Sequence, residues 1–253
     1  MKVNNQMNEQ VAEARKNALE RMTKAGYSIG DSVEVIIDPK LPFMGYTVPI
    51  NGHYRTVVAA GALGTGMIEG LLLHEMSHIY RMQNNHPSHN AKIIGEVIES
   101  LGKEAQSKDY QRKIVGNIVN NIEDLYADDI STKVMRESQL YKPEAVSVFL
   151  QENIEDKSVQ MRDARRESWA NTAIMVDNAR YIGQMKRHKI EDVGGKGESA
   201  NKRFLAQVSP RIAEKYQYFF DIVVNLKEDL TEEGYRRLLS EYLNTFVHVA
   251  DEN

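Results

Sequence analysis

Cysteine is absent from the 253-residue chain, whereas histidine occurs seven times. Without cysteine the protein can form no disulfide, thiolate nucleophile, iron–sulfur cluster or cysteine-containing zinc site. Any transition metal must therefore be bound by histidine and carboxylate side chains. The positions of the histidines consequently matter more than their number.

The chain also lacks a concentrated basic block and a long apolar run. Its 32 Lys and Arg are outnumbered by 36 Asp and Glu, so the sequence does not predict nucleic-acid binding, which needs clustered positive charge. The best apolar run, 57–73, is interrupted by Glu69 and four glycines, while a membrane span needs about 20 apolar residues. The first residues contain no apolar signal segment. We therefore expect a cytoplasmic protein with neither a nucleic-acid nor a membrane partner.

The hydrophobic pattern predicts an α+β fold that is mostly helical. Alternating apolar residues favour three strands in the first 60 residues, and Asn51-Gly52 between the last two is typical of a hairpin turn. Helical periodicity dominates the remainder of the chain. The predicted strands are 32–37, 46–50 and 54–59, and the predicted helices are 7–24, 66–82, 91–106, 109–135, 157–188, 210–226 and 231–249.

The helix predicted over 66–82 contains the motif His74-Glu75-x-x-His78. Residues four apart lie about 40° apart around a helix and about 6 Å along it, so both imidazoles can point at one ion. Glu75 lies one position round, where it can accept a proton from a water on that ion. Apolar residues surround the motif, and buried imidazole and carboxylate groups are costly unless something satisfies them. This context favours a metal site over a chance match.

The motif segment resembles the active-site helix of zincin metallopeptidases, and the preceding hairpin is similar to that fold; the resemblance covers about 54–130. In the metzincin branch, Gly and His follow the second motif histidine at the third and sixth positions, where this sequence has Arg81 and Asn84. That branch is excluded, and the lack of cysteine excludes a deformylase-like ligand set. The remaining resemblance, to the gluzincin branch, implies a zinc-dependent peptidase whose third ligand is a Glu on a downstream helix.

The helix predicted over 109–135 is the place to look for this third ligand. A narrow polar stripe borders its apolar face, and Glu123 lies on that border nearest the core. We therefore choose Glu123 as the third zinc ligand. Asp124, His86 and His89 remain the alternatives.

The resemblance also implies a carboxylate that orients a ligand histidine. In gluzincins this acid follows the ligand Glu by four residues, where the present sequence has Ala127. Asp124 or Asp128, together with Asn120, would have to supply the second hydrogen bond of His74 or His78. Tyr126 is a possible transition-state donor, as are three residues of the helix predicted over 157–188, which are Arg180, Tyr181 and His188.

The sequence thus predicts a zincin-like catalytic region over 1–140 and a helical C-terminal subdomain over 141–253. The predicted function is hydrolysis of peptide or protein substrates, with Zn²⁺ held by His74, His78 and Glu123 and with Glu75 as general base. By family resemblance, the strand at 54–60 would present an open edge to an extended substrate. The alternative is a non-catalytic helical interaction or regulatory protein with a structural or vestigial zinc site. A di-metal carboxylate bundle would need a second Glu-x-x-His, which the chain lacks.

Overall fold

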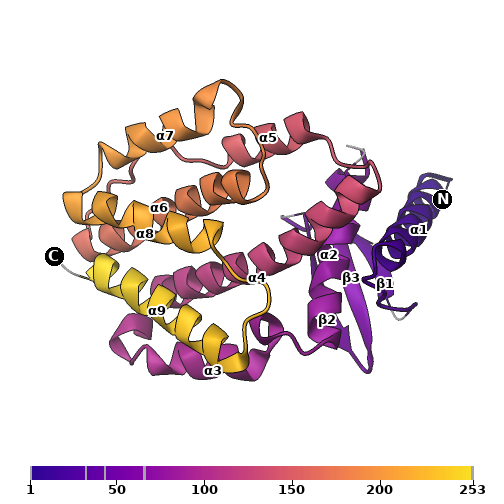
Figure 1. Ribbon diagram of the computed structural model, residues 1–253, viewed down its shortest axis with the longest axis horizontal. Coiled ribbons are helices and arrows are strands. Elements are labelled where there is room, and N and C mark those ends of the chain that lie inside the picture. Colours follow the sequence, from indigo (N-terminus) through magenta and orange to yellow (C-terminus); the bar gives the residue numbers. More distant parts are fainter. Residues whose placement is uncertain (1, 32, 43, 65–66, 252–253) are drawn as a thin grey trace. The chain divides into compact units, whose positions relative to one another are not determined.

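The computed structural model describes residues 2–31, 33–42, 44–64 and 67–251 (Figure 1). It is 69% helical with one small mixed sheet of three strands, which confirms the predicted α+β, mostly helical fold. Among the described residues no helix is long and apolar enough to cross a membrane. The elements are α1 (Lys2–Lys24), β1 (Val33–Asp38), β2 (Gly45–Ile50), β3 (His53–Ala59), η1 (Ala60–Gly64), α2 (Ile68–Gln83), η2 (Pro87–His89), α3 (Ala91–Ser100), η3 (Glu104–Gln106), α4 (Asp109–Glu137), α5 (Pro143–Glu152), α6 (Ala164–Arg187), η4 (Val193–Gly195), α7 (Lys196–Leu205), α8 (Pro210–Val224) and α9 (Glu232–Asp251).

The hairpin predicted from Asn51-Gly52 is confirmed, because β2 and β3 pair antiparallel across this turn. Asn51 and Gly52 have φ of 46° and 86°, the left-handed conformation that a two-residue hairpin requires. β1 pairs parallel with the other side of β3, so β3 is the central strand. The expectation of an open edge on the strand at 54–60 is therefore wrong. The open edge of the hairpin belongs to β2. Pro49 is tolerated there because the N–H that proline lacks would face this open edge, where no strand accepts it.

The described chain divides into two compact units, and the continuous helix α4 contributes to both. The first unit comprises the residues up to His89 together with Tyr126–Tyr141. Its core is formed where α1 packs on α2 and where apolar side chains of the sheet and the C-terminal part of α4 join them. The fully or nearly fully buried members are Ala14, Ala18, Met22, Ile29, Val33, Val58, Leu72, Leu73, Met76, Ile79, Ile130 and Val134.

The second unit comprises Asn90–Leu125 and the residues from Lys142 onward, and it is all helical. Residues Asn90–Leu125, which the sequence analysis assigned to the catalytic region, thus pack within this unit. Helices α6 and α8 lie side by side, as seen in Figure 1. A Cβ at Gly183 of α6 would lie 2.7 Å from Val223 of α8, so only glycine permits this approach. In the N-terminal part of α6, the ring of Trp169 packs edge to face against that of Phe246 of α9, with centroids 5.4 Å apart.

Two helices were not predicted. α5 is short and begins with Pro143, and α7 directly follows two consecutive glycines. Gly194 and Gly195 do form a turn, with φ of 71° and 60°, but α7 starts directly after it. The helix predicted from residue 157 begins only at Ala164, because Asp163 caps it by accepting a hydrogen bond from the backbone of Arg166.

The hairpin turn makes the β-sheet sensitive to one backbone position. We expect Gly52→Ala to lower the free energy of unfolding by about 1–2 kcal/mol, because alanine is strained in the left-handed region. No atom lies within 4 Å of the added Cβ, so the effect is conformational rather than steric. Gly61→Ala, which also adds its methyl group into open space but without a positive φ, is the matched control. Equal midpoints for the two variants in chemical denaturation would contradict the assignment of the turn.

Candidate metal centre

The motif helix α2 turns its apolar residues into the core of the first unit and its two histidines towards a half-buried surface. Leu72, Leu73 and Ile79 are wholly buried. The side chain of His74 is 25% exposed, so solvent reaches it, and His78 is also half-buried. This division follows from the 3.6-residue period, which places His74 and His78 on one side of the helix.

The two histidines converge on one point. Their Nε2 atoms lie 3.1 Å apart, and the ring centroids are 4.8 Å apart at an interplanar angle of 82°. Two nitrogens bound to one tetrahedral zinc at about 2.0–2.1 Å would be about 3.3 Å apart. The observed separation therefore fits a shared zinc ion.

Hydrogen bonds to the outer ring nitrogens orient both histidines. Nδ1 of His74 lies 2.8 Å from Oδ1 of Asp128, and Nδ1 of His78 lies 2.7 Å from Nε2 of His89. When each Nδ1 carries the proton and donates to its partner, both Nε2 lone pairs face each other. Lone pairs at this distance repel unless a cation or a proton lies between them. The outer partners thus prepare the inner nitrogens for a cation.

His86 and His89 form a continuous polar chain with His78 rather than isolated surface groups. Ser88 Oγ lies 2.7 Å from His89 Nδ1 and 2.7 Å from His86 Nδ1. Nε2 of His89 contacts Nδ1 of His78, so His89 orients the His78 ring from the side away from His74. The alternative of His89 as third ligand is not supported by this geometry. Sequence reasoning missed this role because the spacing does not show that the loop after α2 turns back onto the motif.

A carboxylate of α4 joins the pair. Among the described residues, ligand atoms of His74, His78 and Asp124 all lie within 4.8 Å of one another. Glu123, chosen from the sequence as third ligand, is not a member of this group. This grouping favours Asp124, one of the three alternatives, over Glu123 as the residue to test. Asp124 lies one helix position, about 100°, further round α4 than Glu123.

This shift by one residue also explains the apparent departure at Ala127. Counted from Asp124, the acid four residues later is Asp128, and Asp128 is the residue that bonds His74. Both acids lie on one face of the continuous helix α4, one turn apart. Asp128 thus makes the contact with His74 that the sequence analysis expected of Asp124 or Asp128.

Glu123 is directed into a poorly solvated environment instead. Burial, and to a smaller degree the neighbouring charge of Asp124, raises the pKa of Glu123 from 4.5 to about 8. A carboxyl group with such a pKa is largely protonated at neutral pH. The border position inferred from the helical pattern agrees with this burial.

Glu75 lies against the sheet. Its side chain is only 4% exposed, and its Oε2 accepts a hydrogen bond of 2.8 Å from the hydroxyl of Thr47 on β2. A buried carboxylate is costly unless a function or a partner retains it. Thr47 was not identified from the sequence, because no local pattern reveals which strand residue faces a helix.

Asn120 and Tyr126 are not placed for their expected roles. Asn120 is exposed, and its side chain makes no hydrogen bond with the described part of the chain, so the predicted second-layer contact is not supported. Tyr126 is wholly buried with its ring 5.0 Å from that of His86. It lies two positions after Asp124, about 200° around α4, so the two side chains leave opposite sides of the helix. Tyr126 is therefore not supported as a transition-state donor.

Arg81 fixes α2 against α4. Its side chain is 5% exposed, and Nε and Nη2 both donate to the backbone carbonyl of Tyr126, at 3.3 and 3.1 Å. A charged group is buried at such a position only when it is hydrogen bonded. The sequence analysis used Arg81 only to exclude the metzincin pattern, whereas in the structure it sets how the two helices meet.

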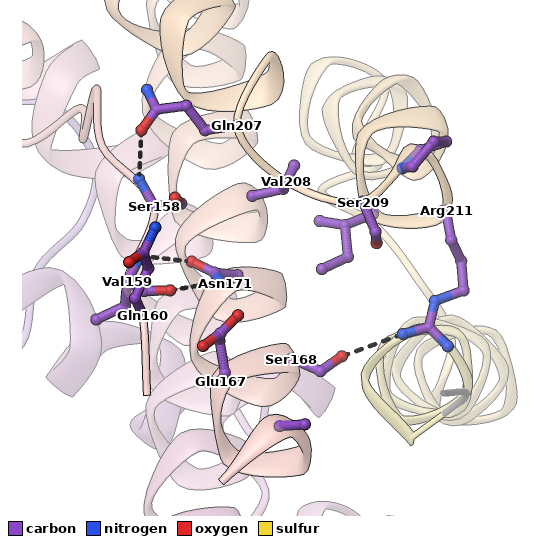
Figure 2. A pocket seen from close by; sticks show the side chains of 13 residues that line it. Ser158, Val159, Gln160, Glu167, Ser168, Asn171, Gln207, Val208, Ser209 and Arg211 are labelled. Atoms are coloured by element: carbon purple, nitrogen blue, oxygen red, sulfur yellow. Dashed lines mark hydrogen bonds between the residues drawn. The ribbon is translucent and has the colours of Figure 1, made fainter. Parts of the chain in front are cut away.

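The second unit contains a hollow of about 490 Å³ beside α6 (Figure 2). Several of its polar side chains are hydrogen bonded within the protein. Asn171 bonds both backbone groups of Val159, at 2.8 and 3.0 Å, and Gln207 accepts from the backbone N–H of Ser158. These amides hold the extended segment before α6, and none of the predicted site residues lines the hollow.

The chain belongs to a family of unknown function, DUF5781, whose sequence model matches residues 19–248. The match includes every residue of the candidate metal centre. No curated protein and no solved structure matches the chain significantly.

Whether Asp124 or Glu123 is the third ligand can be tested with two neutral variants of similar size. We expect Asp124→Asn to lower zinc affinity by at least about 100-fold, beyond the usual effect of an outer-layer group, and Glu123→Gln to keep nearly the parent affinity. Competition with a chromophoric chelator measures both dissociation constants. The reverse order of affinities would restore Glu123 as the ligand.

The raised pKa of Glu123 predicts a pH dependence of stability in the metal-free protein. The folded state keeps the proton up to about pH 8, whereas the unfolded chain releases it near 4.5. This contribution to stability is therefore lost as pH rises from 4.5 to 8, by about 1.4 kcal/mol for each unit of pKa difference. Glu123→Gln should remove the loss, so chelator-treated variant and parent should diverge across this window in denaturation experiments. Glu99→Gln, at an exposed position of α3, is the control, and an equal pH profile for both variants would count against the assignment.

Proposed function

We propose that the protein is a zinc-dependent hydrolase, most specifically a peptidase, with zinc bound by His74, His78 and Asp124. The observation that carries the proposal is the convergence of the two Nε2 atoms at 3.1 Å while both outer nitrogens are engaged. The donor set of two imidazoles and one carboxylate suits zinc and leaves a fourth position for water. We retain the expectation from the sequence that the protein is cytoplasmic.

Zinc bound here would supply a water of lowered pKa and would polarise the carbonyl under attack. The remaining steps belong to the chain's own residues. Glu75, next to His74 in the sequence, accepts the proton of the attacking water and delivers it to the leaving amine. Its 4% exposure keeps the carboxylate away from bulk solvent, so proton transfer takes place within the site.

The sheet supports a peptide as the substrate. Met44 O accepts a hydrogen bond from the N–H of Ala59, so the alternation of an antiparallel pair directs the backbone groups of Gly45 and Thr47 to the open edge of β2. An extended peptide can pair there by β-augmentation. Because the Thr47 side chain bonds Glu75, a chain paired beside Thr47 would lie next to the general base. Pro49 has no N–H to extend the pairing further.

The proposal is tested most simply by Glu75→Gln. We expect kcat for hydrolysis of unstructured peptides to fall by about 10²–10⁴-fold, the usual contribution of a general base, with zinc content unchanged. New amino termini in a peptide mixture give the rate, and metal analysis gives the zinc content. Parent activity should disappear with a chelator and return with zinc.

The rival is a helical interaction protein whose zinc is structural or vestigial. It predicts no hydrolysis by the zinc-loaded parent, or equal rates for the parent and Glu75→Gln. Either result would overturn the peptidase proposal. A retained zinc affinity together with equal rates would favour the rival specifically.

A further inference from the structure

We propose that Thr47 is a positioning residue that holds Glu75 in its reactive orientation; this inference rests on the proposed hydrolase function. The Thr47 hydroxyl donates to Glu75 Oε2 at 2.8 Å. It is the one hydrogen bond of the Glu75 side chain within the described residues, and Glu75 is 4% exposed. The orientation of this buried carboxylate therefore depends on a single strand residue.

The Thr47 hydroxyl is itself fixed from behind. Thr56 Oγ1 lies 2.9 Å from Thr47 Oγ1, and Thr56 is completely buried. Because Thr47 gives its only hydroxyl proton to Glu75, the Thr56 hydroxyl must donate to Thr47. The two threonines face each other directly across β2 and β3, where cross-strand side chains come close. The register of the hairpin thus builds a directed chain from Thr56 through Thr47 to Glu75.

Gly45 provides the space beside the other carboxylate oxygen. A Cβ at this position would lie 3.0 Å from the backbone oxygen of Val57 and 3.4 Å from Glu75 Oε1. An added Cβ would therefore press on the Val57 carbonyl and fill the space beside Oε1. Oε2 is the anchored oxygen, and Oε1 is the oxygen that accepts the proton of the attacking water. The two carboxylate oxygens of Glu75 thus have separate roles, because Thr47 binds Oε2 while Gly45 leaves Oε1 accessible.

Removal of the anchor leaves Glu75 in place but free to change rotamer. A hydrogen bond to a charged group contributes about 1.5–3 kcal/mol, so its loss corresponds to about tenfold or more in a step that needs the fixed orientation. Substrate binding does not use this bond. The expected signature is a lower kcat with a nearly unchanged KM.

The experiment uses the zinc-loaded full-length chain in four forms besides the parent: Thr47→Val, Thr47→Ser, Thr56→Val and Ser77→Ala. Thr47→Val keeps the shape but removes the hydroxyl, and Thr47→Ser keeps the hydroxyl. Ser77→Ala removes a buried hydroxyl of α2 that, among the described residues, bonds only the Leu73 carbonyl, so it is the matched control. Two quantities are measured, the kinetics of peptide hydrolysis and the affinity for acetohydroxamic acid by calorimetry. This probe binds metals through two oxygens and gives its hydroxyl proton to a nearby base, so its affinity reports on Glu75 without turnover.

We expect Thr47→Val to lower both kcat and acetohydroxamic acid affinity by about tenfold or more, at unchanged zinc content. Thr47→Ser should restore both quantities, Thr56→Val should cause a smaller loss, and Ser77→Ala should match the parent. Parent values for Thr47→Val, or a loss that Thr47→Ser does not restore, would overturn the inference. If Thr47→Val does not fold, the comparison of Thr56→Val with Ser77→Ala decides, and equal values contradict the chain of hydroxyls.

The two proposals can fail separately. If the parent hydrolyses no peptide but the variants keep the expected order of acetohydroxamic acid affinity, the peptidase function is wrong and the positioning role of Thr47 stands. If the parent is an active peptidase and all variants bind the probe equally, the positioning role is wrong.

Discussion

The hydrogen bond between Asp128 and His74 is the interaction on which the candidate site depends. It joins α2, which carries the motif, to α4, which carries the acids, and it fixes the proton of His74 on Nδ1. Arg81 secures the same helix pair from the other side through the carbonyl of Tyr126. Once these contacts set the rotation of α4, Asp124 is the acid one turn before Asp128 that faces the histidines. Few alternatives for the third ligand remain.

Partial burial is the observation behind our proposal that this arrangement has a function. The molecule keeps two imidazoles, two acids and the carboxylate of Glu75 at or below a half-buried surface, where each requires a partner. Asp128 and His89 provide partners on the outer side of the histidines, and Thr47 provides one for Glu75. The inner Nε2 atoms face each other at 3.1 Å, where a cation or a shared proton satisfies both.

The sequence predicts the local features of the fold and site well, because they depend on residues close together in the chain. The motif places His74 and His78 on one helical face, and Asn51-Gly52 defines the hairpin. What depends on the rotation or pairing of distant elements is not visible in the pattern. Glu123 and Asp124 differ by one helix position, and both border the apolar face, so only packing decides which acid meets the histidines. Similarly, periodicity identifies β3 as a strand but not as the central one.

Other differences have equally specific causes. α7 was not recognised because Gly194 and Gly195 precede it, although these glycines form the turn and not the helix. The contact of His89 with His78 was not predicted, because it requires the chain to reverse direction after α2. Both α7 and the His89–His78 contact follow a turn, and a single sequence does not define the geometry of that turn.

The central claim is that two histidines and one aspartate hold zinc with a position left for water. X-ray absorption at the zinc edge of the full-length protein loaded with one equivalent of zinc tests it directly. The account predicts two imidazole nitrogens, with oxygen ligands completing a four-coordinate shell, and one imidazole fewer in His78→Ala. A shell of three or four imidazoles, or zinc scattering that is the same in the parent and His78→Ala, would contradict it.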